Sequence, residues 1–124
     1  MKSFIACCFF IIAVTHLNAQ AKPATLTEEQ KIIQLITYVK NLKGAVFIRN
    51  GSEHSATEAA AHLEKKRKNA GKAIKTATDF ISLCATKSSM SGEDYKIRFS
   101  DGKVFRSADL LNKELNRIQN SSTK

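Results

Sequence analysis

Residues 95–105 read YKIRFSDGKVF, and they carry the strongest short-range structural signal in the chain. Apolar and basic residues alternate up to Phe99, and a second short run begins at Lys103 after Asp101-Gly102. An Asp-Gly pair between two such runs is typical of a β-hairpin with a two-residue turn.

The length of the turn sets which residues of the two strands pair. With a two-residue turn, Phe99 faces Val104 and Arg98 faces Phe105. Because side chains alternate between the faces of a strand, Ile97, Phe99 and Val104 are predicted to share the core side.

Four helices are predicted around this hairpin from their start signals and their apolar periodicity. The last is expected to be capped by Ser107. The first and second are expected to end near Gly44 and Gly71, since glycine commonly follows a helix. The first three begin with capping-box pairs, in which two side chains satisfy backbone groups of the first turn. These pairs are Thr27–Gln30, Ser55–Glu58 and Thr76–Asp79.

One further strand is predicted between the first two helices. It runs from Ala45 to Arg49 and ends at Asn50-Gly51. The order of elements is therefore α-β-α-α-β-β-α. We expect a small single α+β domain with a short antiparallel sheet of about three strands and helices packed on one face.

The first 21 residues have the pattern of a secretory signal peptide. Lys2 precedes the apolar run Phe4 to Val14, which is followed by the small-residue pattern Ala19-Gln20-Ala21. This run is shorter than the roughly 20 apolar residues that span a bilayer. We expect cleavage after Ala21, or alternatively after Ala19. Residues 22–124 would then form a periplasmic or secreted domain without a transmembrane segment.

The charge of the chain favours anionic partners. The formal net charge of the chain is +9, from 20 Lys and Arg and 11 Asp and Glu residues. Residues 1–21 contain one of these charged residues, Lys2, so residues 22–124 carry a net charge of +8. Such a surplus attracts phosphates, acidic polysaccharides, anionic headgroups or acidic proteins. Because export is expected, nucleic acid is not expected as a partner.

Cysteine usage excludes an internal disulfide in the expected mature chain, which keeps only Cys84. Phe80, Ile81 and Cys84 recur at helical spacing, which predicts burial of the thiol as a small apolar group rather than a reactive site.

The densest positive stretch is Lys65 to Lys68, with Lys72 and Lys75 beyond it. It lies near the end of the second predicted helix, where cations suit the negative end of the helix dipole. A solvated helix face is the favoured interpretation, and an anion-binding patch is the alternative.

Three chemistry-bearing residues, His54, Glu58 and His62, are spaced four apart. Histidine and carboxylate groups bind zinc, but His54 precedes the cap at Ser55 and Glu58 belongs to the capping box. We therefore expect a surface ion pair of Glu58 with His62, and no metal or cofactor. A hydrolase built on Ser55, His62 and Glu58 lacks a nucleophile motif such as G-x-S-x-G, so no residue is assigned as catalytic and an enzyme is not favoured.

A ligand site is predicted where the first strand meets the second helix. The N-terminus of a helix presents free N–H groups and a positive dipole end, and Arg49 offers a forked donor to carboxylate or phosphate. In the competing interpretation, which is the favoured one, Ser55 and Glu58 already satisfy the helix start, and Arg49 makes a structural ion pair. The residues assigned to this site are Arg49, Asn50, His54, Ser55 and His62.

The run from Phe47 to Ser55, FIRNGSEHS, resembles the YfeK-like family of small exported bacterial proteins of unknown function. The resemblance covers essentially the whole expected mature chain. It implies a signal-bearing, single-domain bacterial protein and supplies no activity, cofactor or catalytic residue. Its other matching motifs are Glu58-Ala59, His62-Leu63, Lys75-Thr76-Ala77, Asp79-Phe80-Ile81, Ser91-Gly92 and Tyr95.

Three functions are consistent with these features. The favoured one is a periplasmic binding or accessory module that recognises an anionic envelope component. The second is an inhibitor or immunity-type partner of another envelope protein. The third is a hydrolase or metal protein centred on the segment from His54 to His62.

Overall fold

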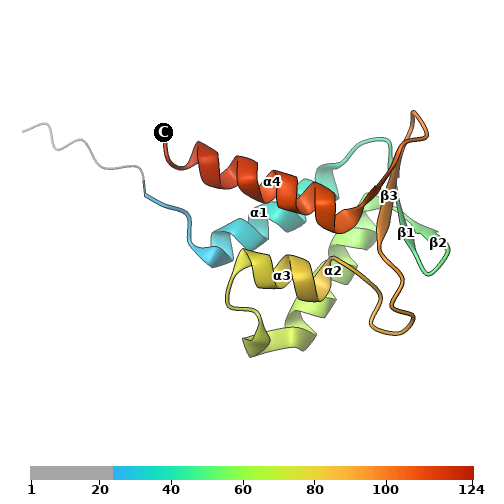
Figure 1. Cartoon of the computed structure of the whole chain (residues 1–124), viewed down its shortest axis with the longest axis horizontal. Helices are drawn as coiled ribbons and strands as arrows, with labels where there is room; N and C mark the ends of the chain where they lie inside the picture. Colours follow the sequence, from blue (N-terminus) through green and yellow to red (C-terminus); the bar gives the residue numbers. More distant parts are fainter. Residues whose placement is uncertain (1–23) are drawn as a thin grey trace, which may run out of the picture.

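The computed structural model describes residues 24–124, and these form an α+β domain of four helices and a four-stranded antiparallel sheet (Figure 1). The helices are α1 (Glu28–Asn41), α2 (Ala56–Ala70), α3 (Ala77–Cys84) and α4 (Ser107–Ser121), with a short 3₁₀ turn, η1 (Gly71–Ala73). The strands are β1 (Ala45–Arg49), β2 (Ser52–His54), β3 (Lys96–Phe99) and β4 (Val104–Arg106). The predicted fold class and order are confirmed, with one more strand than expected. The predicted signal peptide lies outside the described residues.

The additional strand, β2, folds back on β1 at the edge of the sheet. The sheet order is β2-β1-β3-β4. The reversal takes place at Asn50 and Gly51, both in the left-handed region with φ of 51° and 74°. Gly and Asn adopt this region more readily than other residues, so the pair that was expected to end a strand makes a hairpin turn instead.

The first three helices start where their capping boxes predict. In α2, the Ser55 hydroxyl accepts from the Glu58 N–H at 3.1 Å, and the Glu58 carboxylate accepts from the Ser55 N–H at 3.1 Å. The same reciprocal bonds start α1 at Thr27 and α3 at Thr76.

The predicted cap of the last helix is wrong. The N-cap residue of α4 is Arg106, which makes no side-chain capping bond, and Ser107 is the first residue inside the helix. Ser107 is buried, and its N–H donates to the Tyr95 carbonyl at 2.8 Å. Strand β4 runs directly into α4, which leaves no connecting residue for a serine cap.

The hairpin of β3 and β4 has a three-residue turn. The Phe99 N–H donates to the Lys103 carbonyl at 2.9 Å, so Ser100 to Gly102 lie in the loop. Gly102 has φ of 85°, as expected for the glycine that closes a three-residue hairpin turn. The predicted two-residue turn is therefore wrong by one residue.

A shift of one residue moves side chains to the opposite face, so the predicted strand partners are wrong as well. Ile97 pairs with Phe105, and Arg98 pairs with Val104. Ile97 is buried as predicted, whereas Val104 is 50 % exposed. Phe105 instead shares the face of Ile97 and contacts Phe99, with ring centroids 5.8 Å apart, but it is itself 41 % exposed.

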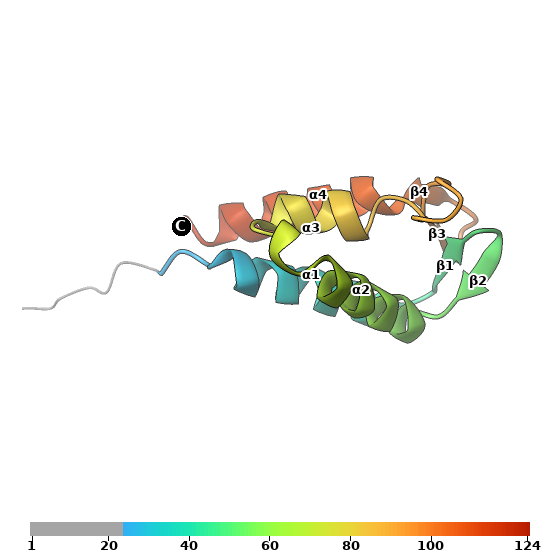
Figure 2. The ribbon, with the colours of Figure 1, turned by 90° about the horizontal axis from the view of Figure 1, so that it is seen from below.

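All four helices lie on one side of the sheet, as Figure 2 shows with the strands at one end of the molecule. The predicted packing on one face is thus confirmed. The helices meet the sheet through Phe47 and Ile97, which pair across β1 and β3 and are both buried. The predicted burial of Cys84 is also confirmed, and burial raises the pKa of its thiol. None of the described helices is long and apolar enough to span a membrane.

Candidate functional site

A cavity of about 40 Å³ lies between the helix-facing side of the sheet, α2 and the first residue of α4. Its walls include apolar Phe47 and Leu63. It also brings together Arg49, His54 and His62, three of the five residues predicted for the ligand site. A volume of this size accommodates a few water molecules or one small polar group of a ligand.

The pleat of the sheet places Arg49 and His54 on the cavity wall. Arg49 is two residues after the buried Phe47 in β1, so the two side chains share a face. His54 pairs directly with Phe47 across β1 and β2, and directly opposed residues also share a face. The strand that the sequence did not predict is therefore the one that brings His54 to the site.

Glu58 contacts His54 rather than His62. The Nδ1 atom of His54 lies 3.4 Å from the Glu58 carboxylate, which also accepts the capping bond of α2. The expected ion pair between Glu58 and His62 is therefore wrong. The other ring nitrogen of His54, Nε2, is buried without a hydrogen-bond partner in the described part of the chain. An unpartnered buried polar atom costs free energy, and it marks a place that a ligand could satisfy.

His62 is paired with Tyr95, which comes from the segment just before β3. The His62 Nε2 atom lies 3.2 Å from the Tyr95 hydroxyl, and the rings meet edge to face at 5.9 Å between centroids. Lys66, one turn further along α2, donates to the same hydroxyl at 3.0 Å and to the Lys87 carbonyl at 3.1 Å. Sequence reasoning gave Tyr95 and Lys66 no role here, because the pairs are 33 and 29 residues apart in the chain.

The local electrostatic potential at His62 is positive. Burial lowers the pKa of His62 to about 4, and the charges of Arg49 and Lys66 act in the same direction. His54 and Lys65 add to this effect. His62 is therefore neutral at pH 7, and an anion entering the cavity would meet a favourable field.

Arg49 makes no ion pair with an Asp or Glu side chain anywhere in residues 24–124. The competing interpretation of the sequence required a structural ion pair of Arg49, and none is present in residues 24–124. Arg98, on the opposite face of the sheet, is bonded to Glu53. Arg49 and Arg98 thus differ in whether a protein carboxylate neutralises them.

The other two predicted site residues serve the scaffold. The Asn50 amide donates to the Ser88 hydroxyl at 3.1 Å, and the Ser91 hydroxyl donates to the Asn50 carbonyl oxygen. The Ser55 hydroxyl is occupied by its capping bond. Neither residue lines the cavity.

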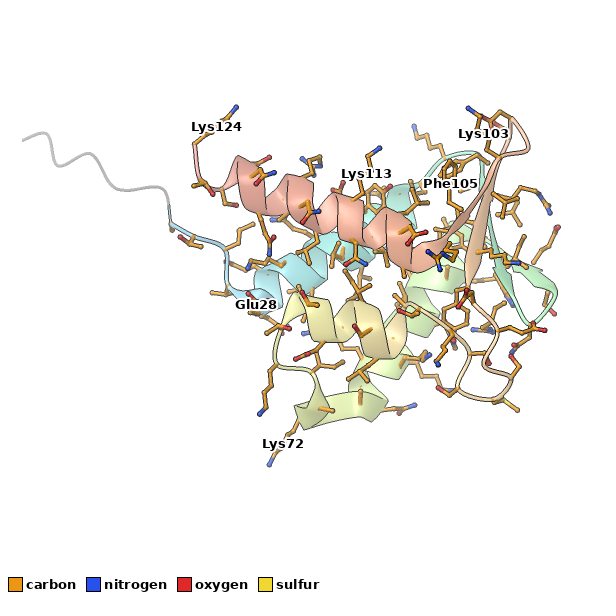
Figure 3. The ribbon with its side chains drawn as sticks, in the orientation of Figure 1. Glu28, Lys72, Lys103, Phe105, Lys113 and Lys124 are labelled. Carbon is orange, nitrogen blue, oxygen red and sulfur yellow. The ribbon has the colours of Figure 1, made fainter. Side chains whose placement is uncertain are left out.

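The basic residues Lys65 to Lys68 of α2 do not form one patch, because consecutive residues of a helix point in different directions. Lys66 turns towards Tyr95 and Arg67 pairs with Glu29, while Lys65 and Lys68 remain exposed. Other lysines project at separate points of the surface, as Figure 3 shows for Lys72, Lys113 and Lys124. The positive surplus is therefore spread over the molecule.

No group of three or more His, Cys, Asp and Glu side chains in residues 24–124 is arranged to hold a metal ion. The histidines at this site have other neighbours. His54 contacts Glu58, and His62 contacts Tyr95.

Comparison with known proteins identifies the family. Residues 26–119 match the model of a family of unknown function, DUF5329. The chain belongs to this family. It is also 37 % identical over 68 residues to the uncharacterized protein YfeK of Salmonella typhimurium strain LT2, a match covering 55 % of this chain and 57 % of that relative. The resemblance predicted from the sequence is therefore confirmed. No solved structure matches the chain significantly.

Proposed function

We propose that this protein is an exported accessory module of the bacterial envelope that binds an anionic group of an envelope component in the cavity beside Arg49. The observation that carries the proposal is Arg49, which lines a small cavity and whose guanidinium has no carboxylate partner in residues 24–124. Guanidinium groups form paired hydrogen bonds with carboxylates and phosphates, and a ligand would supply the missing acceptor.

His54 supports the same proposal. Its Nδ1 atom faces the Glu58 carboxylate, its Nε2 atom is buried without a partner in residues 24–124, and the residue belongs to the cavity wall. When the ring is protonated, Nε2 donates a hydrogen bond to an incoming oxyanion, while Glu58 holds the other side of the ring. The cavity has space for the anionic group alone, so the remainder of the ligand would lie outside it.

The binding test uses the His62 ring as a reporter. An anion beside Arg49 adds a negative charge, so it should raise the pKa of His62 above about 4, as followed by NMR titration with inorganic phosphate and with acetate. Arg49→Leu should abolish the response. Arg98→Leu is the matched control, since it removes the same charge from the opposite face of the sheet. Equal shifts of the His62 pKa in the two variants would mean that the anion responds only to the overall surface charge. No shift in the parent protein would exclude the site.

Export has its own test. Protein recovered from the envelope should have the intact mass of a chain that begins at Lys22, or at Gln20 under the alternative cleavage. A species that retains Met1 and stays in the membrane fraction would overturn this part of the proposal. If export is found, in vivo cross-linking of the tagged protein would show whether the bound component is a polymer, a lipid or a protein.

A further inference from the structure

The contacts between Lys66, Tyr95 and His62 determine which atoms carry the shared protons. The Tyr95 side chain is almost fully buried, and its hydroxyl is within hydrogen-bond distance of both the Lys66 ammonium and the Nε2 atom of His62. Each of these groups has a defined donor and acceptor capacity, so the position of the shared protons can be worked out.

An ammonium group has donors only, so Lys66 donates and the Tyr95 oxygen accepts. The hydroxyl then has one hydrogen of its own to place. Its remaining partner in the described part of the chain is Nε2 of His62, and leaving a buried donor without an acceptor is costly. Tyr95 therefore donates to Nε2, and Nε2 carries the lone pair.

The single ring proton of neutral His62 must then be on Nδ1. This atom makes no hydrogen bond within residues 24–124 and is not fully buried, and His62 is one of the residues that line the cavity. The groups around the ring favour a neutral imidazole, because the cations outnumber the one carboxylate. The carboxylate is Glu58 of α2, and the imidazole of His54 comes from β2. The cations are Arg49 from β1, Lys65 and Lys66 from α2, and Lys96 from β3.

We propose that Tyr95 and Lys66 hold His62 as the neutral Nδ1–H tautomer, so that the cavity presents His62 as a hydrogen-bond donor to its ligand. Tyr95 and Lys66 are positioning residues that act through His62. The ligand group that fits Arg49 and a neutral donor is an acceptor-only oxyanion, and this second part rests on the proposed function. The same arrangement prevents His62 from acting as a base through Nε2, since that lone pair is already used.

The tautomer can be measured without any ligand. Long-range proton–nitrogen NMR of the purified protein at pH 7, with His62 assigned from its missing signals in His62→Gln, should show a protonated Nδ1 and an unprotonated Nε2. Tyr95→Phe removes the donor and should lower the Nδ1–H population at least severalfold. A parent spectrum with Nε2 protonated, or with a charged ring, would overturn the assignment whether or not the variant folds.

The ligand class is tested with two matched variants. An Asn amide reaches the position of Nδ1, and a Gln amide reaches the position of Nε2. His62→Asn should therefore keep acetate binding, measured by shifts of the Arg49 side-chain signals, while His62→Gln should weaken it about tenfold. Acetamide, the uncharged counterpart of acetate, should give no shift.

The failures of the two proposals are distinguishable. If the expected tautomer is found but neither acetate nor phosphate shifts the Arg49 signals, the anion site is wrong and the tautomer assignment stands. If acetate binds equally to His62→Asn and His62→Gln, the site takes anions without His62 as donor, and the second part of the inference is wrong.

Discussion

The interior between α1, α3 and α4 is apolar and closed, whereas the interior between the sheet and α2 has charged and ring-nitrogen groups around a small void. Leu35, Phe80 and Leu111 are fully buried in the first region. The second contains Arg49 and the unpartnered nitrogen of His54. Apolar burial is the main source of folding free energy, and unpartnered polar groups reduce it. The comparison indicates that the helical region supplies most of the stabilising burial, while the sheet end holds polar groups that reduce it.

The largest expected effect belongs to the helical region. Phe80→Ala removes a fully buried aromatic ring and should lower the free energy of unfolding by about 3–5 kcal/mol. Urea unfolding followed by circular dichroism measures the loss. Leu83→Ala, on the same helix but 49 % exposed, should cost far less. Similar losses for the two variants would mean that α3 is not packed as described.

Acid should weaken the sheet end through His62. The pKa of His62 is about 4 in the folded protein, while an unfolded histidine titrates near 6.5. Between these values the unfolded chain binds more protons, so stability falls as the pH drops from about 6.5 to 4 and then levels off. Because solvent reaches part of the ring, we expect about 1–2 kcal/mol rather than the full linkage value. His62→Gln should remove this pH-dependent contribution, and parallel stability curves for the two proteins would contradict it.

Helix caps should show the next effect. Ser55→Ala and Thr76→Ala each remove a capping oxygen and should cost about 1 kcal/mol in thermal or urea unfolding. Ser107→Ala should cost less, since Ser107 lies inside α4 and caps nothing. Equal losses at all three positions would show that α4 starts one residue later than described.

The smallest expected effect on stability is at His54. His54→Leu removes a buried nitrogen without a partner, which offsets the loss of a weak contact with the exposed Glu58 carboxylate. We expect a change within about 0.5 kcal/mol of zero, together with loss of the anion response. A loss as large as that of Phe80→Ala would make His54 a structural residue and remove the contrast between the two regions.

Sequence reasoning succeeded where structure is set by neighbouring residues. The capping boxes at Thr27, Ser55 and Thr76 depend on residues three apart, and all three helix starts are confirmed. The burial of Cys84 followed from helical periodicity in the same way. Such signals are complete within one or two turns of chain.

Sequence reasoning failed where structure depends on pairing between distant segments. One residue in the turn, Ser100, changed the register and exchanged the sheet faces of Val104 and Phe105. The strand β2 was missed because three polar residues, Ser52 to His54, carry no apolar alternation. The contact of His62 with Tyr95 had no local signal at all, and it is the contact on which the tautomer inference rests.

The loop between α3 and β3 is fastened by two side chains from other parts of the fold, Lys66 and Asn50. The Lys87 carbonyl accepts from Lys66, and the Ser88 hydroxyl accepts from Asn50. Met90, at the exposed tip, is 95 % accessible. Exposed loop tips are common places for tolerated insertions, and the attachments at Lys87 and Ser88 both precede Met90 in the chain. A fluorescent label placed at Met90 would therefore sit on an exposed tip five residues from Tyr95 in the chain, where it can test for the proposed ligand binding.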